Sequence, residues 1–186
     1  MKTIDLGAVR AGQASFADIT RDIQHADLYE MTDELFEELE SILAKATDAA
    51  LLFVPHDAAA SDQSEQGWTI SHVVAHLTAT LEEAAAIAAM LARGVQGEER
   101  LRYETPWQDL STLQSVLARL HESHRINRAF LDAWPDEPHL DLTRTVIPRF
   151  GPMNAIGLYT FGIAHGQVHL EQLRETIRQY SLSESR

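Results

Sequence analysis

Two pairs of histidines lie four residues apart, His72/His76 in "SHVVAHL" and His165/His169 in "AHGQVHL". Side chains at positions i and i+4 of an α-helix stand one above the other on one face, so two imidazoles at this spacing can bind a single metal ion. Nine histidines scattered over 186 residues would give about 0.4 such pairs by chance. Finding two pairs points to a metal site without establishing one.

The absence of cysteine narrows this chemistry. It excludes disulfides, thiolate–zinc sites and cysteine nucleophiles, so a metal must be held by nitrogen and oxygen ligands. Any thiol chemistry must then use a thiol that a substrate brings. Imidazole ligands suit zinc, nickel, iron or cobalt rather than magnesium or calcium, and we expect a divalent transition metal, zinc or nickel.

The helical positions of the histidines suggest which of them converge. At ~100° per residue, His165 and His169 lie on the flank of one apolar stripe and His76 on the flank of another, while His72 lies further round and is expected to be exposed. Three histidines from two helices would leave a coordination position open, as in a catalytic metal site. The alternative is three partly buried histidines that hydrogen-bond to backbone or water.

Four long amphipathic segments would have to position these residues. Apolar residues recur at three- and four-residue steps in 28–53, 69–93, 106–134 and 151–180. Gly94 marks the end of the second segment, and Pro152 suits the first turn of the fourth. With no convincing strand pattern and no repeat, the sequence predicts an all-α four-helix bundle.

The domain organisation predicted from this pattern is simple. Residues 1–24 form a polar N-terminal leader, and residues 25–186 form one bundle domain. The connection between the third and fourth segments, residues 135–151, is long for a bundle and carries Arg144 and Arg149. It is either a solvated linker or a loop that covers a site.

Composition argues against several classes of partner. The formal net charge of −13 would be repelled by phosphate backbones, and no basic cluster overrides it, so we expect no nucleic-acid partner. The longest apolar run, Ala84–Ala92, is far below the ~20 residues needed to span a bilayer. The N-terminus lacks a signal-peptide apolar core. We therefore expect a cytoplasmic protein with no membrane partner.

The two histidine motifs resemble those of the DinB-like superfamily of four-helix proteins. That family typically shows a tryptophan, then a histidine eight positions on followed by leucine, and an H-x-x-x-H helix near the C-terminus. The matching positions are Trp68, His76, Leu77, His165 and His169. The resemblance extends from about residue 28 to residue 180, although only these two motifs are specific. It implies a DinB-like bundle whose metal ligands are the three matching histidines.

The resemblance also implies a class of reaction. Characterised branches of the family include transferases and isomerases that use low-molecular-weight thiols such as bacillithiol, mycothiol or glutathione. The chain is thus similar to metal-dependent thiol S-transferases that act on a small-molecule substrate. Arg144 and Arg149 could hold the carboxylates of such thiols. His124 and Asn127 lie in the apolar seam of the third segment. Their side chains either form hydrogen bonds within the core or line the substrate pocket.

Two other functions stay open at this point, and so does enzyme status. The chain could be a non-enzymatic bundle that a metal stabilises, or a hydrolase that uses metal-bound hydroxide. Bundles of this superfamily commonly pair, and the run "EEAAAIAAMLA" offers small side chains that allow close helix approach. We expect a homodimer, although packing within one chain explains the alanines equally well.

Overall fold

The computed structural model describes residues 4–56, 67–97 and 102–185. Its elements in chain order are α1 (Leu6–Arg10), α2 (Phe16–Thr20), α3 (His25–Leu43), α4 (Asp48–Leu51), α5 (Ile70–Ala92), the 3-10 turn η1 (Trp107–Asp109), α6 (Leu113–Asp132), the 3-10 turn η2 (Pro148–Phe150) and α7 (Ala155–Glu184).

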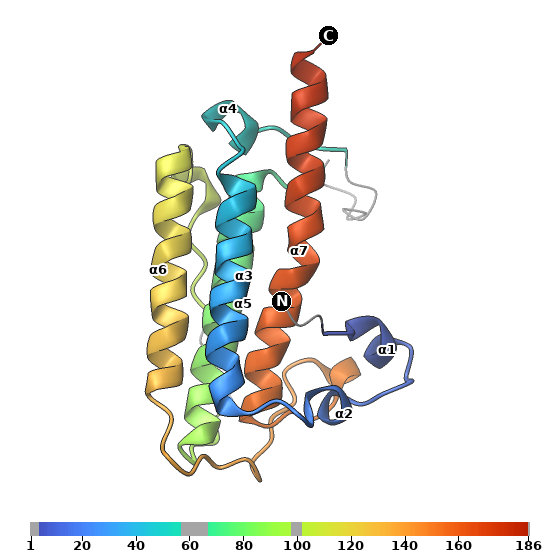
Figure 1. Cartoon of the computed structure of the whole chain (residues 1–186), viewed down its shortest axis with the longest axis vertical. Coiled ribbons are helices and arrows are strands. Elements are labelled where there is room, and N and C mark those ends of the chain that lie inside the picture. Colours follow the sequence, from blue (N-terminus) through green and yellow to red (C-terminus); the bar gives the residue numbers. More distant parts are fainter. Residues whose placement is uncertain (1–3, 57–66, 98–101, 186) are drawn as a thin grey trace.

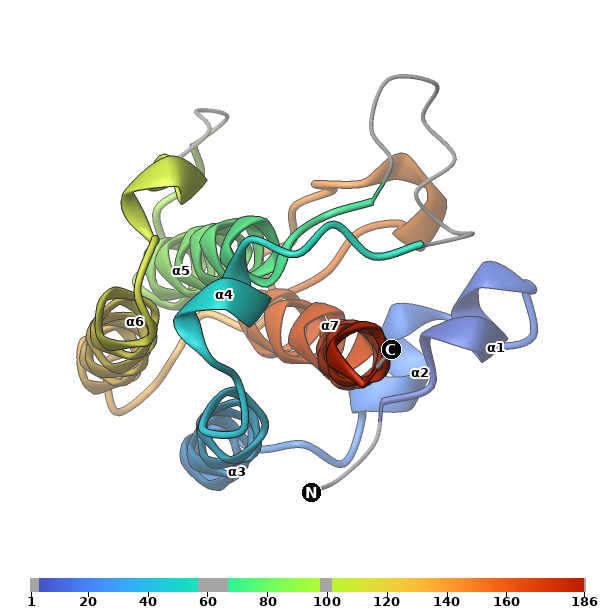
Figure 2. The ribbon, with the colours of Figure 1, turned by 90° about the horizontal axis from the view of Figure 1, so that it is seen from above.

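The four long helices form a bundle, which confirms the all-α prediction. Around the bundle they follow the order α3, α6, α5, α7, and each packs against its two neighbours (Figure 2). Helices α3 and α7 run in one direction and α5 and α6 in the other, so the chain after α5 returns along the length of the bundle before α6 begins (Figure 1). Within the described ranges, β-type pairing is limited to one isolated bridge between Arg144 and Met153.

Helix α5 has the bounds that its sequence predicts, because local signals fix both ends. The Thr69 hydroxyl accepts a hydrogen bond from the backbone N–H of His72 at 3.2 Å and so caps the helix. Beyond the last turn, Gly94 adopts φ +80°, a left-handed conformation that glycine allows without strain.

The first and third predicted segments are shorter than expected. The first divides into α3, which ends at Leu43, and α4, which Thr47 caps. The third begins at Leu113 rather than residue 106, because Thr112 and Ser115 form a capping box there. The residues before this cap fold instead as η1.

The start of the fourth segment also differs from the prediction. The Asn154 side chain accepts from the backbone N–H of Gly157 at 2.9 Å and caps α7. Pro152 therefore precedes the cap instead of lying in the first helical turn. Met153, between Pro152 and Asn154, pairs through its backbone with Arg144 and so holds the segment that leads into α7.

The N-terminal residues described from Ile4 onward pack on the bundle, which their polar composition did not indicate. Helix α1 contacts η2 and α2 contacts α7. Phe16 is 1% exposed, and its ring packs edge-on against those of Phe150 and Phe161. This stretch shares the hydrophobic core of the bundle, and the domain boundary drawn after residue 24 stays a prediction.

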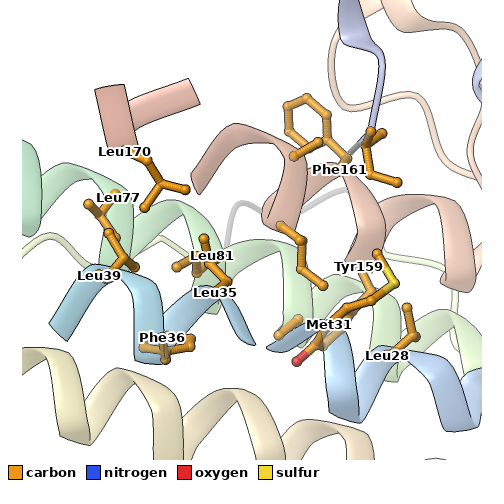
Figure 3. Packing of buried hydrophobic residues seen from close by; sticks show 14 of the residues in the cluster. Leu28, Met31, Leu35, Phe36, Leu39, Leu77, Leu81, Tyr159, Phe161 and Leu170 are labelled. Carbon is orange, nitrogen blue, oxygen red and sulfur yellow. The ribbon is translucent and has the colours of Figure 1, made fainter. Parts of the chain in front are cut away.

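The centre of the bundle is a continuous leucine-rich core (Figure 3). Leu35 and Leu39 of α3 lie beside Leu77 and Leu81 of α5 and Leu170 of α7. Burying each such side chain stabilises the fold by about 1.5–3 kcal/mol before entropy is counted. This core forms one side of the seam between α5 and α7.

Helix α5 is the most buried element. Its alanines from Ala84 to Ala89 are all at most 8% exposed, so the small side chains serve packing within the chain. By length and composition the helix could cross a membrane, but 78% of its most apolar window is buried inside the bundle. Its apolar character is therefore explained by its place in the core.

Candidate metal centre

Three histidines meet in the seam between α5 and α7. His165 Nε2 lies 3.1 Å from His76 Nε2 and 3.1 Å from His169 Nε2. One potential ligand atom from each ring lies within 4.8 Å of the other two. His169 is 8% exposed, and the other two are partly buried.

The donor set fits a transition metal. Bonds of ~2.05 Å with tetrahedral angles place two ligand nitrogens about 3.3 Å apart, close to the two nitrogen–nitrogen distances found here. Within residues 4–56, 67–97 and 102–185, no other histidine, aspartate or glutamate joins the group. The cluster can therefore hold an ion with three imidazoles and leave a position for a further ligand.

Hydrogen bonding prepares His169 for this role. Gln172 lies three residues further along α7, and its Oε1 accepts from His169 Nδ1–H at 2.7 Å. This bond fixes the proton on Nδ1 and leaves the lone pair on Nε2, which faces the cluster. The i, i+3 spacing is visible in the sequence, so Gln172 could have been found there.

Arg102 makes polar contacts with His76 and with residues next to it. Its Nη2 lies 3.3 Å from His76 Nδ1 and donates to the His76 carbonyl at 3.3 Å. Thr80 accepts from Nη1 at 2.8 Å, and Glu83 and Glu104 pair with the guanidinium at 3.5 and 2.5 Å. Arg102 therefore connects His76 to the chain that returns along α5, a contact that sequence spacing does not reveal.

Aromatic rings form a wall beside His76. The Trp68 ring lies edge-on to the His76 ring, with centroids 4.8 Å apart. His72 stacks between Trp68 at 4.4 Å and Trp107 at 5.8 Å. His72 is thus half-buried between two indoles, not exposed as its helical position suggested, and it stays outside the ligand group.

The surroundings favour neutral imidazoles. Burial, followed by the charges of His169, Arg102 and His72, lowers the pKa of His76 to about 4. Burial, then the two neighbouring histidines, then the charges of Arg102 and Arg10 lower the pKa of His165 to about 3. Burial also lowers the pKa of His169, despite the hydrogen bond at its Nδ1. Neutral rings have the free lone pairs that metal ligation needs.

The N-terminal segment and η2 lie on the side of α7 near His165. The backbone N–H of Ile4 donates to Gln167 Oε1 at 3.1 Å, which ties this segment to α7. Gln167 is two residues from His165 and from His169, so it lies on the opposite side of the helix from them. The Phe161 ring packs 6.4 Å from the His165 ring and 5.4 Å from that of Phe150 in η2. Phe161 therefore connects η2 to the His165 ring.

His124 and Asn127 of α6 have partners away from this cluster. His124 Nε2 lies 2.7 Å from Asp33 Oδ1, and its ring stacks on Phe36. The Asn127 amide donates to the Ser123 carbonyl at 2.9 Å. These contacts lie within α6 and between α6 and α3, whereas the three histidines lie between α5 and α7.

Arg144 and Arg149 occupy different places in the long connection. Arg144 lines a hollow of about 560 Å³ with Leu91 near the C-terminal end of α5, fifteen residues and about 22 Å along that helix from His76. The Arg149 guanidinium lies 5.7 Å from the centre of the Phe150 ring. The two arginines therefore lie in different places, Arg149 at η2 and Arg144 beside the end of α5.

Together these features define a four-helix bundle with a three-histidine cluster able to bind a metal ion. A family model described as the DinB superfamily matches residues 28–173, well over half of the chain. The chain therefore belongs to the DinB superfamily, as the two histidine motifs predicted. No curated protein and no solved structure matches it.

Proposed function

We propose that this protein is a metal-dependent thiol S-transferase that binds zinc or nickel at His76, His165 and His169. Its substrates would be a low-molecular-weight thiol, such as bacillithiol, mycothiol or glutathione, and a small electrophile. The proposal draws on the family's thiol-using branches and on a cysteine-free chain.

One observation carries this proposal: the histidine cluster has no fourth protein ligand within the described ranges. A structural metal site is usually closed by four protein ligands, whereas a catalytic one keeps a position for water or substrate. Three neutral imidazoles also leave the full charge of the ion unscreened. The cluster thus favours an enzyme over a bundle that a metal merely braces.

A divalent ion held there would lower the pKa of a coordinated thiol, so that a thiolate nucleophile is present at neutral pH. The three histidines hold the ion, and Gln172 keeps the His169 ring in the required tautomer. Trp68 and Phe161 border the His76 and His165 rings with apolar surface, which would limit water at a bound thiol.

The overall reaction balances without a redox partner. The thiol loses its proton to solvent, the sulfur forms a bond to an electrophilic carbon, and the leaving group departs with the electron pair of the broken bond. For an electrophile that reacts by addition, the displaced electron pair instead takes up a proton from water. Arg149, whose guanidinium lies over the Phe150 ring, would bind a carboxylate of the thiol.

A spectroscopic titration tests the proposal. Protein loaded with cobalt or nickel should develop a sulfur-to-metal charge-transfer band when bacillithiol, mycothiol or glutathione is added, strongest for the true cosubstrate. The band should be absent in His76→Ala and unchanged in His121→Ala, which removes an exposed histidine of α6. Conjugation of the effective thiol to a model electrophile should then require the metal.

The other functions make different predictions in the same experiment. If no thiol perturbs the spectrum at millimolar concentration, the S-transferase proposal fails. Metal-dependent ester or amide hydrolysis would then identify a hydrolase that uses metal-bound hydroxide. Loss of thermal stability on metal removal, with no turnover, would identify a non-enzymatic bundle that the ion stabilises.

A further inference from the structure

We infer that Arg102 is a positioning residue that sets the tautomer of His76. In the metal-free protein it keeps the His76 proton on Nε2, the nitrogen that would bind the metal, and it thereby restrains metal binding. The inference rests on the proposed function only in taking the Nε2 atoms of the three histidines as the ligand atoms. Where the His76 proton lies can be measured without any metal.

The Arg102 guanidinium is fixed against α5 by several partners. Its Nη1 donates to the Thr80 hydroxyl at 2.8 Å and lies 3.5 Å from Glu83 Oε2. Its Nε and Nη2 donate to Glu104 Oε2 at 3.2 and 2.5 Å. The Arg102 side chain is 13% exposed. Its position beside His76 is therefore defined by contacts other than the one with the imidazole.

The contact between Arg102 and His76 permits only one direction of hydrogen bonding. Arg102 Nη2 lies 3.3 Å from His76 Nδ1 and also donates to the His76 carbonyl at 3.3 Å. A guanidinium stays protonated in proteins and has no acceptor, so His76 Nδ1 must accept. A neutral imidazole whose Nδ1 accepts carries its proton on Nε2. The contact therefore selects the Nε2–H tautomer of His76.

The other two histidines have the opposite tautomer in this arrangement. His169 Nδ1–H donates to Gln172 Oε1 at 2.7 Å, which leaves the lone pair on His169 Nε2. His76 Nε2–H can donate to His165 Nε2 at 3.1 Å, which places the His165 proton on its Nδ1. His165 and His169 thus direct lone pairs into the cluster, and His76 directs a proton into it.

The alternative arrangement makes fewer hydrogen bonds. With its proton on Nδ1, His76 would direct an N–H at the Arg102 N–H 3.3 Å away. One proton on His165 Nε2 would then have to serve both neighbouring rings. The inferred arrangement gives up only the contact between His165 and His169. Because a hydrogen bond from a charged donor is about twice as strong as a neutral one, the balance favours the proton on His76 Nε2.

Metal binding would oppose this preference. Ligation through Nε2 requires a lone pair there, so the His76 proton must move to Nδ1. A ligating histidine usually donates its other ring N–H to a carboxylate, a carbonyl or water, whereas Arg102 presents a donor at this position. Gln172 presents an acceptor at the corresponding nitrogen of His169. Gln172 therefore favours metal binding and Arg102 restrains it.

Nuclear magnetic resonance of the metal-free protein tests where the proton lies. Proton–nitrogen correlation spectra of the imidazole rings distinguish a protonated ring nitrogen from an unprotonated one, and His76→Ala and His169→Ala assign the signals. The wild type should carry the proton on Nε2 of His76 and on Nδ1 of His169. In Arg102→Gln, whose side-chain oxygen can accept, the His76 proton should lie on Nδ1. A wild-type His76 protonated on Nδ1 would overturn the inference.

Cobalt affinity, measured by competition with a chelator, tests the consequence. Arg102→Gln should bind cobalt about tenfold more tightly than Arg102→Met, at the lower end of the range typical of outer-shell changes. Both variants remove the positive charge, so the difference between them measures the acceptor at Nδ1. Arg102→Lys keeps a charged donor and should resemble the wild type.

Arg125→Gln is the matched control, since Arg125 pairs with Glu122 on the exposed side of α6. It should leave both the His76 tautomer and cobalt affinity unchanged. Equal cobalt affinities in Arg102→Gln and Arg102→Met would show that Arg102 acts by its charge alone, which contradicts the inference. If the wild type binds no cobalt, the proposed metal-dependent function fails, while the spectra of the metal-free protein still decide the tautomer of His76.

Discussion

Gly162 of α7 faces Ala84 of α5 so closely that a Cβ atom at position 162 would lie 2.8 Å from the Ala84 Cβ. Gly162 is three residues before His165, on the helix that carries two of the three ligands. The contact therefore sets the distance between the two helices that form the candidate metal centre.

Gly162→Ala should force these helices apart. Alanine favours the helix by about 1 kcal/mol over glycine, but the Ala84 methyl cannot rotate away, and overpacking of this kind typically costs ~1–3 kcal/mol. We expect a net loss in the free energy of unfolding of the metal-free protein, measured with urea. Metal affinity, measured by competition with a chelator, should fall as well.

Gly166→Ala is the matched control, four residues further along α7. There the new Cβ would lie 2.8 Å from Leu35 Cδ2, the far end of a flexible side chain that can change rotamer. Stability should change little or increase, and metal affinity should be retained. Equal losses in both variants would show that the close approach of Gly162 to Ala84 does not determine stability or metal affinity.

Sequence periodicity predicted the four-helix bundle because a bundle repeats its apolar stripe along each helix. It also placed both ends of α5, where Thr69 and Gly94 give local signals. It misplaced the starts of α6 and α7. The prediction began each helix near a proline, whereas the helices begin after the capping residues Thr112 and Asn154. Polar composition likewise hid the packing of Phe16.

The residues of the site also fall into those that local spacing predicts and those that only contacts between distant segments bring in. The four-residue histidine spacing and the helical wheel singled out the three residues that meet in the structure. Arg102 reaches His76 only through the return of the chain along α5. No periodicity within one helix carries that information. His72 was misjudged for the same reason, since Trp107 comes from another element.

Replacing each ligand should remove the metal. Purified protein should hold about one transition metal per chain, and His76→Ala, His165→Ala and His169→Ala should each weaken binding by more than the 10–100-fold typical of outer-shell changes. Elemental analysis after dialysis measures this. His72→Ala should keep the metal, and metal retained in the His169→Ala protein would refute the ligand set.

Gln172→Leu should weaken metal binding without unfolding the helix. Leucine is a good helix former, but it cannot accept the His169 Nδ1–H, so the ring loses its fixed tautomer. We expect roughly 10–100-fold weaker metal binding by chelator competition, with Gln172→Glu close to the wild type. Gln179→Leu, two turns further along, should leave affinity unchanged. An unaltered affinity in Gln172→Leu would show that this hydrogen bond does not tune the site.

The protein is expected to form a homodimer, although not through the alanine run of α5, which is buried within the chain. A dimer interface must therefore use other surface. Multi-angle light scattering at micromolar concentration should give about twice the chain mass of 20.8 kDa. A mass near that of one chain would contradict the expectation.

Asp33 should make α3–α6 packing sensitive to acid. Burial alone would raise the pKa of Asp33, but hydrogen bonds from Arg128 and His124 outweigh it and hold the pKa below its ordinary value of 3.8. Because the folded pKa is the lower one, this stabilisation is complete above 3.8 and is lost as the pH falls through the folded value. Each partly exposed pair contributes about 1 kcal/mol or less.

Asp33→Asn should therefore lower the free energy of urea unfolding at pH 7, and the difference from the wild type should shrink as the pH drops below 3.8. A double-mutant cycle with Arg128→Gln isolates the ion pair, whose Nη1 lies 2.5 Å from Asp33 Oδ2. In the Arg128→Gln background, Asp33→Asn should cost less at pH 7. A difference between wild type and Asp33→Asn that stays constant from pH 7 to pH 3 would show that this carboxylate does not link α3 and α6 through its charge.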